Sequence, residues 1–185
     1  MSVPAQRPAT YEDLCQVPDH LVAQIIHGQL ITLPRPAPRH ARASSIMGGK
    51  LVPSYDEGNG GPGGWWILDE PELHLHPDIL VPDLAGWRRE RMPALPETAY
   101  FELAPDWVCE VLSPSTRRMD RADKLPIYAG HGVAHAWLVD PEAQTLEVFS
   151  LQDRHWRLER VYQGEEEVCS PPFDAIRFSL GGFWA

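Results

Sequence analysis

One unit of the sequence constrains the fold more than any other, a strand–helix–strand pattern between residues 105 and 141. The run Trp107–Leu112 is apolar apart from one acid, as in a strand buried on both faces. Residues 116–129 predict a helix, and Gly130 to Gly132 is typical of a helix end. The apolar run 133–139 predicts a second strand. The short connections predict parallel neighbouring strands with a right-handed crossover.

The acid in the first apolar run is Glu110. Burying an unpaired charge is costly, so Glu110 needs a partner, a bound cation or a position at an opening. In the following helix Asp120, Lys124 and Tyr128 recur every four residues and therefore share one face. Two interpretations of Asp120 remain open, a local cap or salt bridge and a role in a site. Tyr128 either packs in the core with its hydroxyl at the edge or supports a site.

A second acid, Asp83, follows Pro82 inside apolar sequence, and neighbouring strands could bring it to Glu110. Paired carboxylates are typical ligands of Mg²⁺ or Mn²⁺, which prefer oxygen donors. Such a metal activates water for phosphodiester hydrolysis, and a lysine such as Lys124 orients the water or contacts the phosphate. The alternative is a purely structural Glu–Lys ion pair, and spacing alone leaves both interpretations open.

These motifs resemble the Uma-two family, which is similar to the restriction-endonuclease-like nucleases with a Pro-Asp…Asp/Glu-x-Lys motif. The resemblance covers most of the chain and rests on Pro82-Asp83, the run EVLSPST at residues 110–116, Asp120, Lys124, Tyr128 and the closing FDAIRFSL. The sequence departs from the wider pattern at Leu112, where those nucleases carry the lysine. The Uma-type pattern moves that lysine to the following helix, where Lys124 lies. A glutamate common in the early segment of family members is Gln24 here.

The resemblance implies an α/β (α+β) fold, with a mixed central sheet flanked by helices and additional antiparallel hairpins, as one domain over residues 1–185. It implies a metal-dependent endonuclease that cleaves DNA with Mg²⁺ or Mn²⁺. The implied metal ligands are Asp83, Glu110 and the backbone carbonyl of Val111, and Lys124 assists. Gln24, Asp120 and Tyr128 are supporting candidates. The competing hypothesis is a nuclease fold that has become a non-catalytic binding or regulatory module.

Two basic clusters could contact phosphates, or could equally be solvated surface. The first begins the helix after Glu110 and consists of Arg117, Arg118 and Arg121. The second lies where a proline-rich loop meets an earlier helix and consists of Arg35, Arg39, His40 and Arg42.

The alternating residues His74, His76 and Asp78 predict one strand face. Alternating histidines can bind a metal such as Zn²⁺. The competing interpretation is the exposed polar face of an edge strand. We also expect β-hairpins over residues 21–33 and 145–162, and a loose arm over residues 1–9.

Charge and composition narrow the functional classes. The formal net charge of −10 disfavours a protein that holds a long DNA duplex unaided, because phosphate neutralisation drives such binding. No apolar run approaches the ~20 residues of a membrane span. The three widely spaced cysteines make a disulfide framework unlikely and favour a cytoplasmic protein. Exposed apolar edges and tryptophans predict a homodimer.

Overall fold

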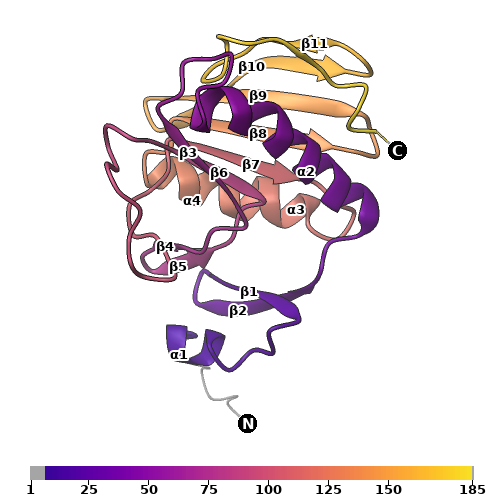
Figure 1. The fold of residues 1–185 in the computed structure, drawn as a ribbon. Helices are drawn as coiled ribbons and strands as arrows, with labels where there is room; N and C mark the ends of the chain where they lie inside the picture. The colour runs from indigo at the N-terminus through magenta and orange to yellow at the C-terminus, as the bar shows by residue number, and fades with distance from the viewer. Residues whose placement is uncertain (1–6, 185) are drawn as a thin grey trace.

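A six-stranded sheet forms the centre of the protein in the computed structural model, which describes residues 7–184 (Figure 1). Its strand order is β10-β9-β8-β7-β6-β3, and every neighbouring pair is antiparallel except β7 and β8. This mixed sheet agrees with the predicted fold class. The strands are β3 (Trp65–Asp69), β6 (Leu84–Arg88), β7 (Trp107–Val111), β8 (His135–Asp140), β9 (Thr145–Gln152) and β10 (His155–Gln163).

The predicted parallel pair is confirmed, with Glu110 of β7 opposite Leu138 of β8. The connection between them is a continuous helix over residues 117–130, with turns on either side, and the helix widens in the middle. It comprises α3 (Arg117–Met119), the π-helical turn η2 (Asp120–Lys124) and α4 (Leu125–Gly130). Pro126 has no N–H to bond the carbonyl four residues earlier, which favours a wider turn before it. Gly132, with φ +76°, follows the end of α4.

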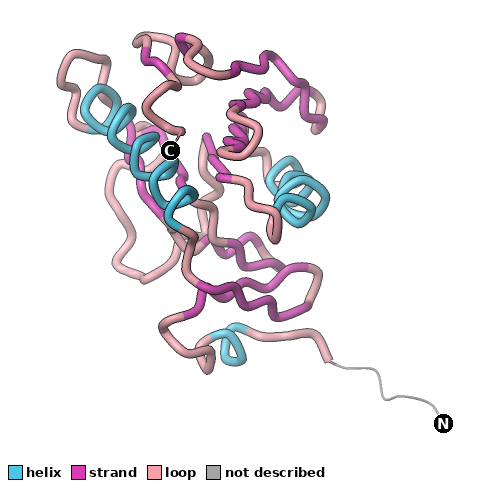
Figure 2. Tube along the Cα trace, turned by 90° about the vertical axis from the view of Figure 1, so that its right-hand side faces the viewer, coloured by secondary structure: helices cyan, strands magenta, loops and turns pink. Residues whose placement is uncertain are grey.

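Helices cover both faces of the sheet (Figures 1 and 2). On one face α2 (Pro38–Leu51) and the π-helical turn η1 (Val52–Asp56) pack on Trp107, Cys109 and Val111 of β7. On the other face, α4 packs on Val108 and the neighbouring strand β8. Alternation along β7 therefore sends Glu110 to the face that carries α3, η2 and α4.

A four-stranded sheet of order β2-β1-β5-β4 lies beside the central sheet. Its strands are β1 (Leu21–Ile26), β2 (Gln29–Pro34), β4 (Leu73–Leu75) and β5 (Asp78–Leu80). The predicted hairpin is confirmed, and its turn places His27 at φ 51° and Gly28 at φ 75°. The prediction that His74, His76 and Asp78 share one strand is wrong. The chain reverses at His76-Pro77, so that β4 pairs with β5.

The two ends of the chain are attached to this frame. Helix α1 (Tyr11–Leu14) is capped by Thr10, whose hydroxyl accepts from Asp13 N–H. Of the predicted loose arm, residues 1–6 lie outside the described residues, whereas Ala9 N–H donates to the Gly28 carbonyl at 2.8 Å. At the other end β11 (Glu167–Val168) pairs with β12 (Phe178–Ser179). Phe173 and Phe183 are buried in the α2-side core, so the apolar tail docks as expected.

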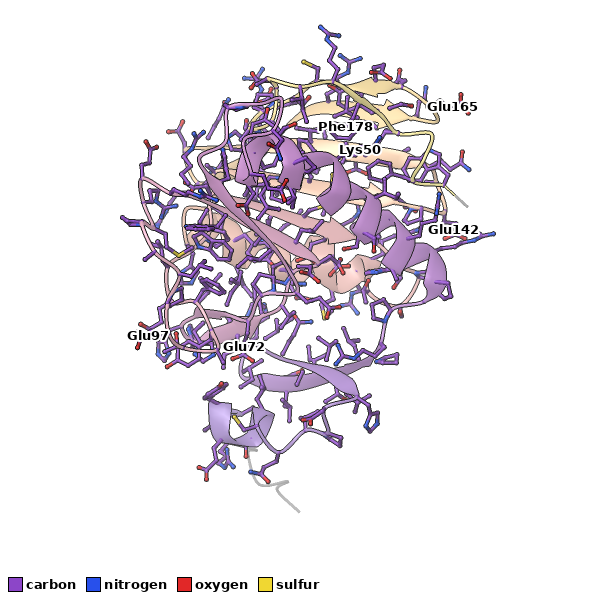
Figure 3. The ribbon with its side chains drawn as sticks, viewed as in Figure 1. Lys50, Glu72, Glu97, Glu142, Glu165 and Phe178 are labelled. Atoms are coloured by element: carbon purple, nitrogen blue, oxygen red, sulfur yellow. The ribbon has the colours of Figure 1, made fainter. Side chains whose placement is uncertain are left out.

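Some of the acidic side chains are exposed at the edge of the molecule, as Glu97, Glu142 and Glu165 are in Figure 3. Within residues 7–184, no helix has the length and apolar character needed to cross a bilayer.

Candidate active site

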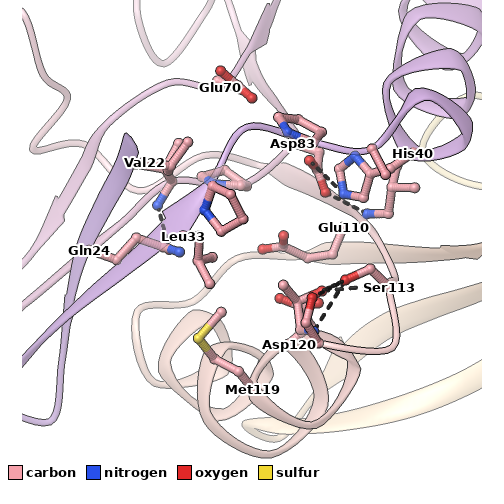
Figure 4. Close-up of a pocket in the computed structure, with 18 of the residues that line it drawn as sticks. Val22, Gln24, Leu33, His40, Glu70, Asp83, Glu110, Ser113, Met119 and Asp120 are labelled. Carbon is pink, nitrogen blue, oxygen red and sulfur yellow. Dashed lines mark hydrogen bonds and ion pairs between the residues drawn. The ribbon is translucent and has the colours of Figure 1, made fainter. Parts of the chain in front are cut away.

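The predicted acids and lysine line one cavity of about 370 Å³ (Figure 4). Its floor is formed by residues from the end of β7 and from η2, and one wall is the β1–β2 hairpin. The start of α2 and the segment between β5 and β6 complete it. Polar groups at the floor include Asp83, Glu110, Asp120 and Lys124, whereas aliphatic and proline side chains form much of the wall.

Glu110 and Lys124 form a buried ion pair at this floor, and each is only 2% exposed. Lys124 Nζ lies 2.7 Å from Glu110 Oε1 and 2.8 Å from Oε2. The same ammonium donates to the Val81 carbonyl at 3.0 Å. Tyr128 donates its hydroxyl to Glu110 Oε1 at 2.6 Å. Lys124 and Tyr128 therefore fix both carboxylate oxygens, and the Tyr128 hydroxyl points to the site rather than to a solvent edge.

Burial sets the protonation of this group of residues. Desolvation raises the pKa of Glu110 to about 8, against the lowering influence of Lys124 and with the charges of Asp120 and Asp83 adding to the rise. Burial also raises the pKa of Asp120, whose Oδ1 lies 3.8 Å from Lys124 Nζ. Desolvation alone would lower the pKa of Lys124, but the carboxylates around it outweigh this and raise it. Desolvation is thus the main reason that both carboxyl groups hold their protons more tightly than usual.

Asp83 lies on the other side of the cavity and is held from two directions. Its Oδ2 accepts from the backbone N–H of Val111 at 2.6 Å. Its Oδ1 lies 3.3 Å from His40 Nε2, and both side chains are 14% exposed. Burial alone would lower the pKa of His40, but the hydrogen bond and charge of Asp83 outweigh it and raise that pKa. Val111 thus contacts Asp83 through its N–H, and a metal-ligand role of its carbonyl stays a prediction.

Gln24 reaches the same cavity from β1. It is 1% exposed, and its Oε1 accepts from Val81 N–H at 2.9 Å. Gln24 and Lys124 therefore hold the two sides of the Val81 peptide, which leads into Pro82-Asp83. The early glutamine positions the segment between β5 and β6 that carries Asp83.

The contact of His40 with Asp83 was not predicted from the sequence, where His40 belongs to a basic cluster with two interpretations, a phosphate contact and solvated surface. A signal was present: the buried positions Ala43, Met47 and Leu51 of α2 follow His40 at helical spacing, so His40 belongs to the inward face. The sequence did not predict that the N-terminal end of α2 lies beside Asp83.

The basic residues expected at phosphates are largely engaged elsewhere. Arg117 lies 3.1 Å from both Asp140 and Glu142, and Arg121 pairs with Glu147 at 2.5 Å. Arg118 is exposed on α3. A phosphate contact by any of the three remains a prediction.

The predicted histidine site does not assemble. His74 bonds Glu72 at 2.7 Å and stacks on Tyr100, while Asp78 accepts from His27 N–H at 2.6 Å. Across residues 7–184, no group of three or more histidine, cysteine, aspartate or glutamate side chains converges as a metal centre. Any metal at the candidate site would therefore depend on two carboxylates with backbone, water or substrate oxygens.

Comparison with known proteins places the chain in a family. The model of the Uma2 family, described as "Putative restriction endonuclease", matches residues 8–180. A crystal structure from Anabaena variabilis, described as "a putative nuclease belonging to DUF820", superposes with a TM-score of 0.76. It shares 22% identity and covers 96% of this chain and 98% of that one, and so shows a common fold. No curated protein matches the chain. The protein therefore belongs to the Uma2 family, the family that its Pro-Asp, EVLSPST and lysine motifs resemble.

Proposed function

We propose that the protein is a metal-dependent endonuclease that hydrolyses DNA phosphodiester bonds at the cavity holding Asp83, Glu110 and Lys124. The observation that carries the proposal is that two carboxylates, Asp83 and Glu110, line a single cavity together with Lys124. DNA as the substrate rests on the family description.

The residues present fit a hard divalent cation. Asp83, Glu110 and Asp120 bring three carboxylates to the cavity, and burial raises the pKa values of Glu110 and Asp120, a desolvation cost that a bound cation would offset. Mg²⁺ commonly binds one or two protein carboxylates and completes its shell with waters and substrate phosphates. Asp83 and Glu110 would hold the cation, with the Val111 carbonyl as a third ligand. When bound, Mg²⁺ or Mn²⁺ would supply Lewis-acid activation of water and neutralise charge on the phosphate.

The chain's own residues would orient these groups. The Val111 N–H and His40 fix the Asp83 carboxylate, which leaves its remaining lone pairs for the cavity. Tyr128 and Lys124 fix Glu110. The Lys124 donors are used by Glu110 and the Val81 carbonyl, so a contact with the scissile phosphate requires the phosphate to replace Val81. The aliphatic wall would limit water access around the reacting phosphorus.

The test is calorimetric titration of Mn²⁺ into the wild type and the variants Asp83→Asn and Glu110→Gln. We expect one binding event that either substitution abolishes, together with Mn²⁺-dependent cleavage of DNA by the wild type alone. Glu97→Gln is the matched control, because Glu97 is an exposed glutamate in a loop.

Two outcomes would contradict the proposal. Mn²⁺ binding that persists in both site variants would place the metal elsewhere. An intact fold with neither Mn²⁺ binding nor cleavage would favour the non-catalytic module.

We also propose that the protein is a homodimer. Leu158 and Val161 are 50% and 46% exposed on β10, the edge strand of the central sheet, which a second copy would cover. Light scattering should give the dimer mass for the wild type and a lower mass for Leu158→Lys. A monomeric wild type would refute this.

A further inference from the structure

A second cavity of about 300 Å³ adjoins the candidate active site. Four residues line both cavities: Val22, Arg35, Glu70 and Val81. The second cavity extends from these residues to α1, where Tyr11 forms part of its wall. The two spaces are therefore neighbours along one face of the β1–β2 hairpin, with Arg35 and Glu70 between them.

Arg35 is the cationic residue common to the two cavities, and its present contacts are weak. Its guanidinium lies 3.3 Å from Glu70 and donates to the Asp19 carbonyl at 2.9 Å. The side chain is 58% exposed. Exposed ion pairs contribute little to stability, so Arg35 could exchange Glu70 for a phosphate at small cost. A guanidinium binds phosphate through two parallel hydrogen bonds, which favours this exchange.

Part of the remaining basic surface is already neutralised. Apart from Arg35 and the buried Lys124, the sequence has fourteen basic residues, and six of them form ion pairs with acids. Arg89, Arg91, Arg117 and Arg121 all do so. Duplex binding depends on neutralising several phosphates at once. An acidic protein with so many engaged arginines is poorly suited to hold a duplex along its surface.

The cavities instead suit single nucleotides. Their volumes lie near the lower end of the range of about 300–1,000 Å³ that is typical of small-ligand sites. A base can enter such a space only after leaving the helical stack. Leu33, Pro34 and Met119 line the first cavity, and Tyr11 lines the second. Apolar and aromatic surfaces of this kind bind the faces of unstacked bases with little sequence preference.

We propose that the substrate is an unpaired DNA strand that crosses from the candidate active site to the second cavity over Arg35. The scissile phosphate lies at Asp83 and Glu110, a neighbouring phosphate binds Arg35, and the next base enters the second cavity. This assignment rests on the proposed nuclease function, because the active-site cavity fixes where the strand is cut.

The acidic residues that line the second cavity favour the binding of a base, and not of a phosphate, in that cavity. Glu72 bonds His74 at 2.7 Å, Glu70 faces Arg35, and Asp19 lines the same cavity. Carboxylates repel phosphate but accept hydrogen bonds from the exocyclic amines of cytosine and adenine. The backbone of the strand is therefore expected at Arg35 and its base beyond it.

The test is fluorescence anisotropy with a labelled single strand of about 12 nucleotides, a length within the range of single-strand-binding sites. The same sequence as a blunt duplex is the competitor, and Ca²⁺ replaces Mg²⁺ or Mn²⁺ so that the phosphate at Asp83 and Glu110 meets a cation. We expect the single strand to bind about tenfold more tightly than the duplex. Arg35→Ala should weaken single-strand binding about tenfold and lower the slope of log K against log salt by about 0.7.

Arg157→Ala is the matched control. Arg157 is 62% exposed and pairs with Glu159 on β10, away from both cavities. Equal or tighter binding of the duplex, or equal losses in Arg35→Ala and Arg157→Ala, would overturn the inference. A cleavage assay with Mn²⁺ separates it from the proposed function. If single-strand binding depends on Arg35 but no DNA is cleaved, the strand path is supported and the nuclease function is refuted. If duplex and single strand are cleaved at equal rates, the nuclease function is supported and the strand path is refuted.

Discussion

Lys124→Met is the substitution that most directly tests how the buried site is stabilised. It removes the ammonium that lies 2.7–2.8 Å from both oxygens of Glu110 and leaves that carboxylate buried with Tyr128 as its donor. Removing one partner of a buried ion pair costs about 3–5 kcal/mol, because the other charge remains desolvated. With a urea slope of about 2 kcal/mol per molar, the unfolding midpoint should fall by about 1.5–2.5 M.

The assay is urea unfolding followed by tryptophan fluorescence, with Trp107 and Trp137 buried in the core as reporters. The double variant Glu110→Gln/Lys124→Met is the key comparison. It removes both charges, and replacing a whole buried pair is often neutral. We expect the double variant to recover most of the loss of Lys124→Met. A loss below about 1 kcal/mol, or a double variant no more stable than the single one, would refute the reasoning.

The loss should also depend on pH in a defined direction. The pKa of Glu110 is raised to about 8 from an ordinary value of 4.5, and removing Lys124 raises it further. The folded chain then holds a proton that the unfolded chain releases above about pH 4.5, so the stability of Lys124→Met falls as pH rises from there. Wild-type Glu110 also holds its proton up to about pH 8, so the two proteins lose stability in parallel below that pH and the defect grows above it. The defect is therefore smaller at pH 7 than at pH 9. A defect independent of pH would mean that packing, not charge, is responsible.

Three further predictions concern residues around the site and the sheet. His40→Ala should lower Mn²⁺ affinity about 10–100-fold by calorimetry, because His40 orients Asp83; unchanged affinity would contradict this. Gln24→Ala should destabilise the fold by about 1–3 kcal/mol in urea, since it leaves Val81 N–H without its acceptor, whereas Gln24→Glu should tighten Mn²⁺ binding. Burial and the charge of Arg88 lower the pKa of His135. The stability of the fold should therefore fall as pH drops below about 6.5, where the unfolded chain binds the proton more readily than the folded chain. His135→Gln should flatten this part of the stability–pH curve.

The sequence predicted the parts of the fold that depend on local patterns. The apolar runs around Glu110 and before Asp140 are β7 and β8, and His27-Gly28 is the hairpin turn. The division of residues 73–80 into β4 and β5 was missed because the alternation of His74, His76 and Asp78 suggested one strand, although Pro77 marked a turn.

The candidate site was predictable to the extent that it lies on neighbouring strands and the following helix. Glu110 and Lys124 meet because β7 leads directly into that helix. The contact of His40 with Asp83 and that of Val81 with Lys124 could not be read from spacing, because each joins elements whose approach is decided by packing of the whole domain. Asp83 was selected by its position after Pro82 in apolar sequence, and the family resemblance then implied its role as a metal ligand.

The π-helical turn η2 has a consequence for comparing relatives. A π turn holds one more residue than an α turn, so it is equivalent to an insertion within a helix. A relative that lacks this residue would carry its lysine one position earlier in the chain while placing it at the same point in space. Alignments of the family that forbid a gap between Asp120 and Pro126 would then pair Lys124 with the wrong residue. An apparent loss of the lysine in such a relative would reflect a shorter helix turn rather than a lost active site.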